Sequence, residues 1–268
     1  MSQLLQQSHS ANGSRVVRCA LIQTGGMMNP AEIFQRQLEL VREAAGRGAQ
    51  VICLQELATG PYFCQVETRE WFALAEPVPD GPSTVAVSAL AAELGVVIVL
   101  PLYENARGDF YNTAVVVDAD GSYLGKYRKV HIPGHEHHEP DRPFQHAERY
   151  YFTPSTEGFP VWDAFGGRVG MMICNDRRWP ESYRVMGLQG VEMILCGYNT
   201  PLHYVPDPTQ DPLQGFHNGL VMQSGAYQNG TFVVGVAKGG VEEGVDSLAD
   251  SMIVAPSGEI LKIGRAHV

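Results

Sequence analysis

The stretch QVICLQE, residues 50–56, decides the fold expected for this sequence. Its apolar side chains follow one another almost without a break, which is typical of a strand covered on both faces. A helical pattern of apolar residues precedes it over residues 30–49 and another follows over residues 81–95. Further strand-like apolar runs occupy residues 15–24 and 96–104. Strands that alternate with helices in this way predict a sheet built from βαβ units.

Residue types mark the ends of these two helices. Gly46 or Gly48 is expected to end the first helix, because glycine readily takes the left-handed conformation that closes a helix. Ser83 or Thr84 is expected to start the second helix, because a hydroxyl oxygen can accept a hydrogen bond from a free N–H of the first turn.

The rest of the chain predicts a second sheet. Turn residues between apolar runs indicate one hairpin around residues 118–121 and another around residues 166–167. The elements expected after the second hairpin are a helix from Pro180, a strand over 192–199, a helix near 212–229, and strands over 231–240 and 251–263. We therefore expect one α/β domain, with two sheets inside and the helices outside.

Length, charge and cysteine content restrict the class of protein. A chain of 268 residues is long enough for one large domain. Its net charge of −10 disfavours a role on nucleic acid or on an anionic membrane, and no apolar run approaches the length of a transmembrane helix. The five cysteines form no CxxC pair, which indicates reduced thiols rather than a disulfide framework. We therefore expect a cytoplasmic protein.

The two ends of the sequence are expected to lie outside the domain. Residues 1–14 are polar and lack the features of a signal peptide, so they are interpreted as a disordered leader. Residues 263–268, IGRAHV, can be back-translated into a common sequencing-library adapter. We expect this tail not to be natural and the natural chain to continue, with an ordinary frayed terminus as the alternative. The domain is then expected over residues 15–262.

Cys174 is the strongest candidate for a reactive group. It ends the strand-like run in GRVGMMICNDRRWPE (167–181), and Arg177, Arg178 and a helix start at Pro180 follow it. A thiol acts as a nucleophile in its thiolate form, and a positive field from arginines and a helix N-terminus is expected to raise the thiolate fraction. The cysteines within other apolar strand runs, namely Cys19, Cys53 and Cys196, are expected to be core residues.

Glu56 and Lys129 are candidates for acid-base and oxyanion chemistry. Glu56 closes the buried strand, where loss of solvent would raise its pKa toward that of a general base; a hydrogen-bonded carboxylate at a strand end is the alternative. Alternation along residues 125–134 places Lys129 on one face and Lys126 and Arg128 on the other. An inward lysine can stabilise an oxyanion, and a solvated edge strand is the alternative.

Four histidines lie in the segment HEHHEPDRPFQH, residues 135–146. The segment holds His135, His137, His138 and His146 together with Glu136 and Glu139. Their spacing fits neither HExxH nor a CxxC pair, and the run resembles a polar loop, so no metal site is expected. A non-catalytic metal-binding protein, with an inert Cys174, remains the alternative from another class. The sequence also lacks a phosphate-binding loop and a GxSxG motif, and no cofactor is expected.

Three stretches together resemble the nitrilase superfamily of carbon-nitrogen hydrolases. They hold Glu56 in LQELATGPYF, Lys129 in KYRKVHIPG and Cys174 in ICNDRRWPE, in the order of the superfamily's Glu, Lys and Cys set. The resemblance covers residues 15–262 and implies a four-layer α-β-β-α sandwich. Within the superfamily the chain is most similar to N-carbamoyl-D-amino acid amidohydrolases, through RPFQHAERYYF, CNDRRWPESYRVMGLQG, GYNTP, QSGAYQNG and IVAPSGEI.

The resemblance also implies roles for these residues. Cys174 would attack a ureido or amide carbonyl, while Glu56 would take the thiol proton, pass it to the leaving nitrogen and then activate water. Lys129 and the backbone N–H that follows Cys174, that of Asn175, would hold the oxyanion. Glu148 matches a second glutamate near such sites. His131 and His146 match positions that line the pocket.

A carbamoyl amino acid carries a carboxylate, for which the resemblance suggests a binding set. Arg177 and Arg178 can present forked donors to a carboxylate, and Asn199 and Thr200 follow the next strand, where they could complete the clamp. The alternative for one of the arginines is a structural ion pair. The expected partner is thus a small carbamoyl or amide compound that bears a carboxylate.

The chain also resembles members of the superfamily with other substrates, and it departs from the family in two places. The alternatives are carbamoyl-β-alanine, carbamoylputrescine or a simple amide, and a nitrile fits the NDRRWPE context less well. Family members continue past the APSGEI hairpin with a further strand and a tail that helps subunit contacts, so a homo-oligomer is expected for the full-length protein. The HEHHEPD loop differs from the one expected in D-carbamoylases, which predicts a different pocket rim.

Overall fold

The apolar run near residue 50 forms strand β4 (Val51–Leu54), in which every residue is buried. In this computed structural model, which describes residues 8–9, 15–134, 146–204 and 207–264, β4 belongs to a five-stranded sheet of order β3-β4-β5-β6-β7. The other strands are β3 (Cys19–Ile22), β5 (Val97–Ala106), β6 (Asp109–Val117) and β7 (Tyr123–Arg128). The first three strands are parallel, and β6 and β7 continue as an antiparallel meander. The predicted βαβ arrangement is therefore confirmed.

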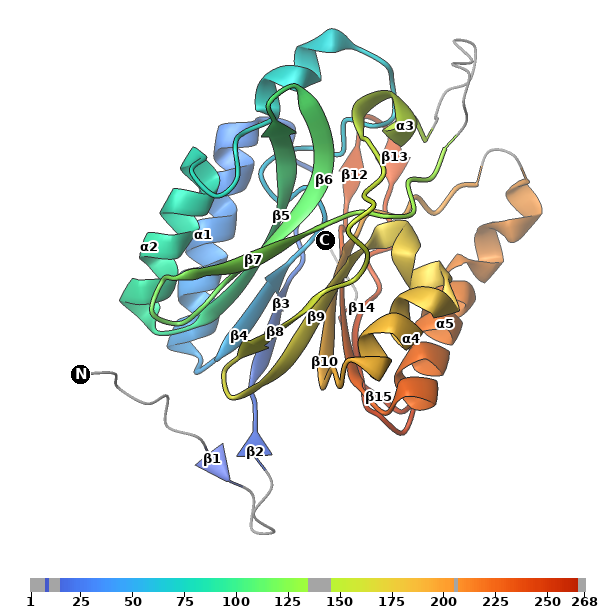
Figure 1. Ribbon diagram of the computed structural model, residues 1–268. Helices are drawn as coiled ribbons and strands as arrows, with labels where there is room; N and C mark the ends of the chain where they lie inside the picture. Colours follow the sequence, from blue (N-terminus) through green and yellow to red (C-terminus); the bar gives the residue numbers. More distant parts are fainter. Residues whose placement is uncertain (1–7, 10–14, 135–145, 205–206, 265–268) are drawn as a thin grey trace.

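Helices α1 (Pro30–Gly46) and α2 (Pro82–Leu94) cover one face of this sheet (Figure 1). Ile52 and Leu54 of β4 pack there against side chains of both helices. The first helix ends at Gly46, one of the two predicted ends. The predicted start of the second helix is wrong, because α2 begins at Pro82 and neither Ser83 nor Thr84 caps it with its side chain. The Glu76 carboxylate accepts from the Ser83 N–H at 3.0 Å and so serves this helix start from outside the helix.

The second half of the chain forms a six-stranded sheet of order β15-β14-β11-β10-β9-β8. Its strands are β8 (Val161–Ala164), β9 (Gly167–Ile173), β10 (Met193–Tyr198), β11 (Phe232–Ala237), β14 (Ser251–Val254) and β15 (Ile260–Gly264). Helices α4 (Pro180–Leu188) and α5 (Gln214–Asn229) lie on its outer face (Figure 1). A separate hairpin, β12 (Val241–Glu242) and β13 (Val245–Asp246), was not expected. Two 3-10 helices outside the sheets are η1 (Arg69–Leu74) and η3 (Pro208–Leu213).

The inner faces of the two sheets pack against each other, which completes the predicted α-β-β-α sandwich (Figure 1). Val51 and Cys53 of β4 join one core with residues of β9 and β10 such as Met171 and Cys196. Cys53 and Cys196 are buried core residues as expected, Cys19 packs against the same core, and all five cysteines are free. Because β4 and β10 approach closely, the residues that follow these strands come together at one edge of the sandwich.

The two ends of the chain are described only in part. Two residues of the expected leader form β1 (Ser8–His9), which pairs antiparallel with β2 (Arg15–Val16). The rest of the leader, residues 265–268 of the expected tail and residues 135–145 lie outside the described residues. In the part of the chain that the structure describes, no helix has the length and apolar character needed to cross a membrane.

Candidate active site

Cys174 stands directly after β9, at the point where the strand turns into the 3-10 helix η2 (Cys174–Arg178). Its φ is 46°, a left-handed conformation that is strained for a residue with a Cβ. The side chain is buried, and its thiol donates to the main-chain oxygen of Asn199 over 3.4 Å. The sharp turn thus places the sulfur at the edge where the ends of the parallel strands meet.

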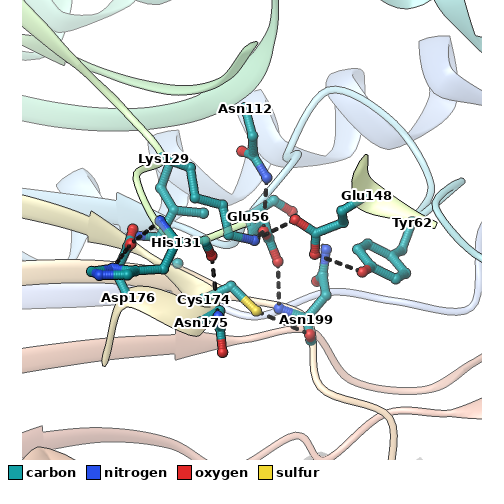
Figure 2. A network of polar contacts seen from close by, with 12 residues as sticks. Glu56, Tyr62, Asn112, Lys129, His131, Glu148, Cys174, Asn175, Asp176 and Asn199 are labelled. Atoms are coloured by element: carbon teal, nitrogen blue, oxygen red, sulfur yellow. Dashed lines mark hydrogen bonds and ion pairs between the residues drawn. The ribbon is translucent and has the colours of Figure 1, made fainter. Parts of the chain in front are cut away.

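Three charged side chains surround this thiol (Figure 2). Glu56 follows β4, Lys129 follows β7, and Glu148 begins the short helix α3 (Glu148–Tyr151). Lys129 Nζ lies 2.8 Å from Glu56 Oε1 and 2.5 Å from Glu148 Oε2, and all three side chains are completely buried. One oxygen of each carboxylate and the sulfur of Cys174 lie within 4.8 Å of one another. The structure therefore brings together all four residues that the sequence singled out for chemistry.

Amide and hydroxyl groups fix the two carboxylates (Figure 2). Asn112 Nδ2 donates to Glu56 Oε1 over 2.8 Å, and the main-chain N–H of Asn199 donates to Glu56 Oε2 over 2.9 Å. The Tyr62 hydroxyl donates to Glu148 Oε1 over 2.8 Å. Sequence reasoning missed Asn112 and Tyr62. The only available signal for Asn112 was a lone amide at the start of the apolar run YNTAVVV, residues 111–117.

The thiol of Cys174 is neutral in this resting arrangement. Burial raises its pKa to about 12, and the nearby Glu56 carboxylate acts in the same direction. Lys129 and Arg177 lower the pKa, but they do not outweigh the loss of solvent. The expectation that the arginines would produce a high thiolate fraction is therefore wrong. The proton must be removed by a base during attack, and Glu56 is within reach.

Lys129 and Glu148 respond to burial in opposite ways. Burial alone would lower the pKa of Lys129, but Glu148 and Glu56 raise it well above its ordinary value, so the ammonium form persists. Burial raises the pKa of Glu148 to about 7, with Lys129 opposing the shift and Glu56 adding to it. A permanent cation thus lies between two carboxylates, one of which titrates near neutral pH.

The residues around the thiol also include possible metal ligands. Glu56, Glu148 and Cys174 could supply three ligand atoms to one ion. However, the ammonium of Lys129 already lies between both carboxylates and compensates their charge. Of the histidine-rich segment only His146 is described, half-buried and two residues before Glu148, whereas His135, Glu136, His137, His138 and Glu139 lie outside the described residues.

The two arginines after Cys174 have different environments. Arg177 is buried, and its guanidinium donates to Cys174 O over 2.7 Å, to Thr200 Oγ1 over 2.8 Å and to Asn218 Oδ1 over 3.0 Å. It also lies 4.1 Å above the centre of the Tyr198 ring. No carboxylate among the described residues contacts it, so the alternative of a structural ion pair finds no support there for Arg177, and its bonds are to neutral groups.

Arg178, in contrast, is exposed. Among the residues that the structure describes, it has no hydrogen bond and no ion pair. Surrounding protein and the neighbouring Arg177 cation lower its pKa to about 10, which leaves it charged at neutral pH. Asn199 and Thr200 are buried directly after β10, as expected, and Thr200 connects this strand end to Arg177. Within the described part of the chain, a second cation thus stands unpaired four residues after the nucleophile.

His131 contacts two residues of η2, Asp176 and Asn175. His131 Nδ1 lies 2.8 Å from Asp176 Oδ1, and its ring stacks between those of Phe159 and Trp179. Asn175 Nδ2 donates to the main-chain oxygen of His131 over 3.1 Å. Asp176 is completely buried and was missed from the sequence, where it was one polar residue among several in CNDRR.

The positive charges of Lys126 and Arg128 on strand β7 are compensated by a buried carboxylate. Lys126 Nζ and Arg128 Nη2 lie 2.5 and 2.7 Å from Glu104 Oε1, and Glu104 is almost completely buried. The alternative of a solvated edge strand is therefore wrong for this face. The other face carries Tyr127 toward Asp176, and Lys129 follows at the end of the strand toward the carboxylates.

Comparisons with known proteins agree with this geometry. The sequence model of the family described as "Carbon-nitrogen hydrolase" matches residues 18–266. An N-carbamoylputrescine amidase of Solanum lycopersicum is 38% identical over 220 residues, which are 82% of this chain and 69% of that protein. A citrullinase of Francisella tularensis is 34% identical over 179 residues, 67% of this chain and 60% of that protein.

Solved structures of other proteins share this fold. The carbon-nitrogen hydrolase of Helicobacter pylori G27 superposes with a TM-score of 0.82 at 28% identity, over 93% of this chain and 85% of that one. An amidase of Nesterenkonia sp., with a TM-score of 0.74 and 20% identity over 99% of this chain and 90% of that one, shares the fold.

Proposed function

Because the chain belongs to the carbon-nitrogen hydrolase family and is a hydrolase of non-peptide C–N bonds, we propose that it acts on N-carbamoyl amino acids. The products would be the amino acid, carbon dioxide and ammonia, released through a thiol acyl-enzyme. Several relatives are named for carbamoyl compounds, which supports a carbamoyl substrate in general. The D configuration rests on the resemblance of CNDRRWPESYRVMGLQG to D-carbamoylases.

In the proposed mechanism, Glu56 is the base that the neutral thiol requires. As Cys174 Sγ attacks the carbonyl carbon, Glu56 takes the thiol proton and then gives it to the leaving nitrogen. Lys129, together with the N–H of Asn175, stabilises the oxyanion. Glu148 holds the Lys129 ammonium in place through the 2.5 Å contact. Water then releases the acyl group, with Glu56 again as the base.

The observation that carries the substrate proposal is the pair of arginines for which the described residues provide no carboxylate partner. Arg177 is buried and contacts only neutral groups among the described residues, and Arg178 is exposed with no partner there. A carboxylate on the substrate would compensate this positive charge and can accept two parallel hydrogen bonds from a guanidinium. We assign the direct contact to Arg178, since the donors of Arg177 already serve Thr200, Asn218 and Cys174. His131, His146 and Asn199 would line the rest of the pocket.

A panel of substrates and two variants test this proposal. The panel contains N-carbamoyl-D- and L-amino acids, carbamoyl-β-alanine, carbamoylputrescine, citrulline and a simple amide, assayed for released ammonia. Arg178→Ala should raise KM for carboxylate substrates at least about tenfold, as expected for loss of a hydrogen bond to a charged group, and leave the simple amide unaffected. Arg36→Ala, an exposed arginine of α1, is the matched control.

The second candidate is a carbamoyl compound with a cationic end. The similarity to N-carbamoylputrescine amidases favours it, whereas the two arginines oppose it. Preferred turnover of carbamoylputrescine, with no loss in Arg178→Ala, would replace the first proposal by this one.

We also propose that the protein is a homo-oligomer and that it occupies a reducing compartment. Apolar side chains of α4 and α5 are exposed, among them Leu188, Phe216, Leu220 and Tyr227, which supports a homo-oligomer in which a second copy covers this face. Light scattering after size-exclusion chromatography should then give a mass above that of one chain, and a monomer would contradict it. The five free cysteines support a reducing compartment such as the cytoplasm.

A further inference from the structure

A buried ion pair in the second half of the chain has no role in the mechanism above. Lys238 follows β11 and Glu242 ends β12, and both side chains are almost completely buried. Lys238 Nζ lies 2.8 Å from Glu242 Oε1 and 2.9 Å from Glu242 Oε2. Such a pair gains little net stability, because the cost of removing two charges from water offsets their attraction. A role other than stability of the fold is therefore indicated.

Glu242 also binds the loop that follows Glu56. This loop, residues 57–65, is buried except at Thr59, so its main-chain N–H groups need partners within the protein. The Tyr62 main-chain N–H donates to Glu242 Oε2 over 3.0 Å, across 180 residues of sequence. The position of Tyr62 thus depends on a carboxylate that the hairpin β12–β13 supplies.

Tyr62 carries this support into the reaction centre (Figure 2). Its hydroxyl donates to Glu148 Oε1 over 2.8 Å, and Glu148 Oε2 contacts Lys129 Nζ. Burial, together with the Glu148 carboxylate, raises the pKa of Tyr62 well above its ordinary value, so the hydroxyl keeps the proton that it donates. A hydrogen bond to a carboxylate favours the charged form of that carboxylate. Glu148 needs this charge to hold the Lys129 ammonium.

We propose that Glu242 is a positioning residue for the reaction and that Lys238 is the counter-ion that allows a carboxylate at this buried place, an inference that rests on the roles of Glu148 and Lys129 proposed above. Glu242 holds the main chain of Tyr62, and the Tyr62 hydroxyl keeps Glu148 ionised. Glu148 in turn holds Lys129 where the oxyanion forms. Neither Glu242 nor Lys238 touches the reacting atoms.

The charge of Glu148 depends on groups from several segments. Those on other segments are Lys129, Glu56, Tyr62, Cys64 and Cys174, and its own segment adds His146, Arg149, Tyr150 and Tyr151. Burial raises the pKa of Glu148 to about 7, Lys129 and the Tyr62 hydroxyl oppose this effect, and Glu56 adds to it. Burial also raises the pKa of both thiols, so they are uncharged at neutral pH. Loss of the Tyr62 hydroxyl should therefore favour the protonated form of Glu148.

The first variant removes only this hydroxyl. Tyr62→Phe keeps the ring, and we expect the acid limb of its kcat/KM profile to move to higher pH by about one pH unit. Below neutral pH, kcat/KM should fall about tenfold, whereas at high pH, where Glu148 is ionised in both proteins, the two profiles should converge. Ammonia release from the best substrate of the panel gives the profile. An unchanged profile overturns the proposed role.

Two double variants then test Glu242. Lys238→Met/Glu242→Met removes both charges together, so neither is left buried without its partner, and it also removes the acceptor for the Tyr62 N–H. We expect the same displacement of the acid limb as in Tyr62→Phe. In Lys238→Met/Glu242→Gln a side-chain oxygen still accepts this hydrogen bond, and most of the displacement should be reversed. Arg42→Met/Glu93→Met, which removes an exposed ion pair between α1 and α2, is the matched control.

A triple variant separates positioning from general stabilisation of the fold. If Glu242 acts through the Tyr62 hydroxyl, Tyr62→Phe added to Lys238→Met/Glu242→Met should move the acid limb no further. Displacements that add together overturn the proposed role, as does a wild-type profile in the double variant. If the double variant does not fold in a thermal melt, Glu242→Asp takes its place, because it keeps the charge but withdraws the carboxylate from the Tyr62 N–H. A wild-type profile in Glu242→Asp likewise overturns the role.

Failure of the proposed function would have a different signature, namely no ammonia from any substrate of the panel. The positioning role can still be tested in that case, since Glu148 adds to the effect of burial on the pKa of Cys174. The rate of Cys174 alkylation by iodoacetamide, followed against pH by peptide mass spectrometry, should then bend at a higher pH in Tyr62→Phe and in Lys238→Met/Glu242→Met than in wild type. Identical alkylation profiles in the three proteins overturn the role.

Discussion

At the residue scale, the reactivity of Cys174 depends on its neighbour Glu56 more than on the arginines that follow it in the sequence. Burial holds the pKa of the thiol at about 12, so little thiolate exists at neutral pH before substrate binds. Three donors, from Asn112, Lys129 and Asn199, keep the Glu56 carboxylate in one position. A fixed base beside a neutral thiol can couple proton removal to attack.

Removal of this base should therefore abolish most of the activity. Glu56→Gln preserves the shape of the side chain but cannot take the thiol proton, and we expect kcat/KM for the best substrate to fall about 10²–10⁴-fold. Glu157→Gln changes an exposed carboxylate in the same way and should leave kcat/KM unchanged. Steady-state ammonia release measures both variants, and wild-type activity in Glu56→Gln would refute the role of this base.

Glu148 should make folding stability depend on pH. Its pKa in the folded protein is about 7, above its ordinary value of 4.5, so between these pH values the folded state binds more protons than the unfolded state. Stability from this group is therefore present at low pH and is lost as pH rises toward 7. The difference between urea midpoints at pH 5 and pH 7.5 should shrink in Glu148→Gln. An undiminished difference would contradict this, and Glu157→Gln provides the control.

Sequence reasoning found Glu56 and Cys174 because each one closes an apolar strand-like run, and it found Lys129 because basic residues on both faces of one strand are conspicuous. It missed Asn112 and Tyr62, which act through contacts across 56 and 86 residues of sequence. A single sequence carries no signal for such contacts. The predicted direction of the pKa shift of Cys174 was also wrong. Burial raises this pKa more than the neighbouring arginine lowers it, and the extent of burial depends on tertiary packing.

At the scale of elements, the short helix η2 is held in place by Asp176. Asp176 accepts hydrogen bonds from the Tyr127 hydroxyl over 2.6 Å and from the N–H of Ile173 over 3.0 Å. It also accepts from the main-chain N–H of His131 over 2.9 Å. These bonds connect β7, the segment after it and the end of β9. They therefore hold the strained turn at Cys174 against the strand that carries Lys129.

The substitution Asp176→Asn tests this role of the element. The amide retains one oxygen, and its NH₂ group would face donors, so we expect a loss of about 1.5–3 kcal/mol in the free energy of unfolding. Displacement of the turn should also lower kcat. Asp163→Asn, which changes an exposed aspartate of β8, is the matched control. Urea denaturation with a parallel activity assay checks both, and unchanged stability in Asp176→Asn would show that these bonds are dispensable.

Element types were predictable from periodicity, whereas some element ends were not. The strand at residues 51–54 and the helix from Pro180 agree with their patterns. The start of α2 was misassigned because Glu76, outside the helix, satisfies the Ser83 N–H that a local cap would have served. The charges of Lys126 and Arg128 were likewise unexplained until the fold placed Glu104 on the adjacent strand.

At the scale of the whole molecule, the site depends on how closely the two sheets approach. The first sheet supplies Glu56 and Lys129, and the second supplies Cys174 and Asn199. Gly197 of β10 makes the approach possible, since a Cβ there would lie 2.6 Å from Glu56 N and 2.9 Å from Leu54 O. Periodicity predicts that two sheets exist, but it cannot set this distance. The position of the base relative to the nucleophile is thus a property of sheet packing.

Gly197→Ala should therefore damage catalysis by moving one sheet against the other. The new methyl group meets the main chain of β4, which cannot yield as a flexible side chain can, so we expect a stability loss of about 1–3 kcal/mol. Because Glu56 moves away from Cys174, kcat should fall by roughly a hundredfold.

Gly235→Ala overpacks the same sheet against the flexible side chain of Met222 and should lose stability with little loss of kcat. Gly46→Ala, at the end of α1 with open space around it, should change neither quantity. Equal losses of kcat in Gly197→Ala and Gly235→Ala, measured at matched folded fractions, would mean that general destabilisation and not the spacing of the sheets limits the reaction.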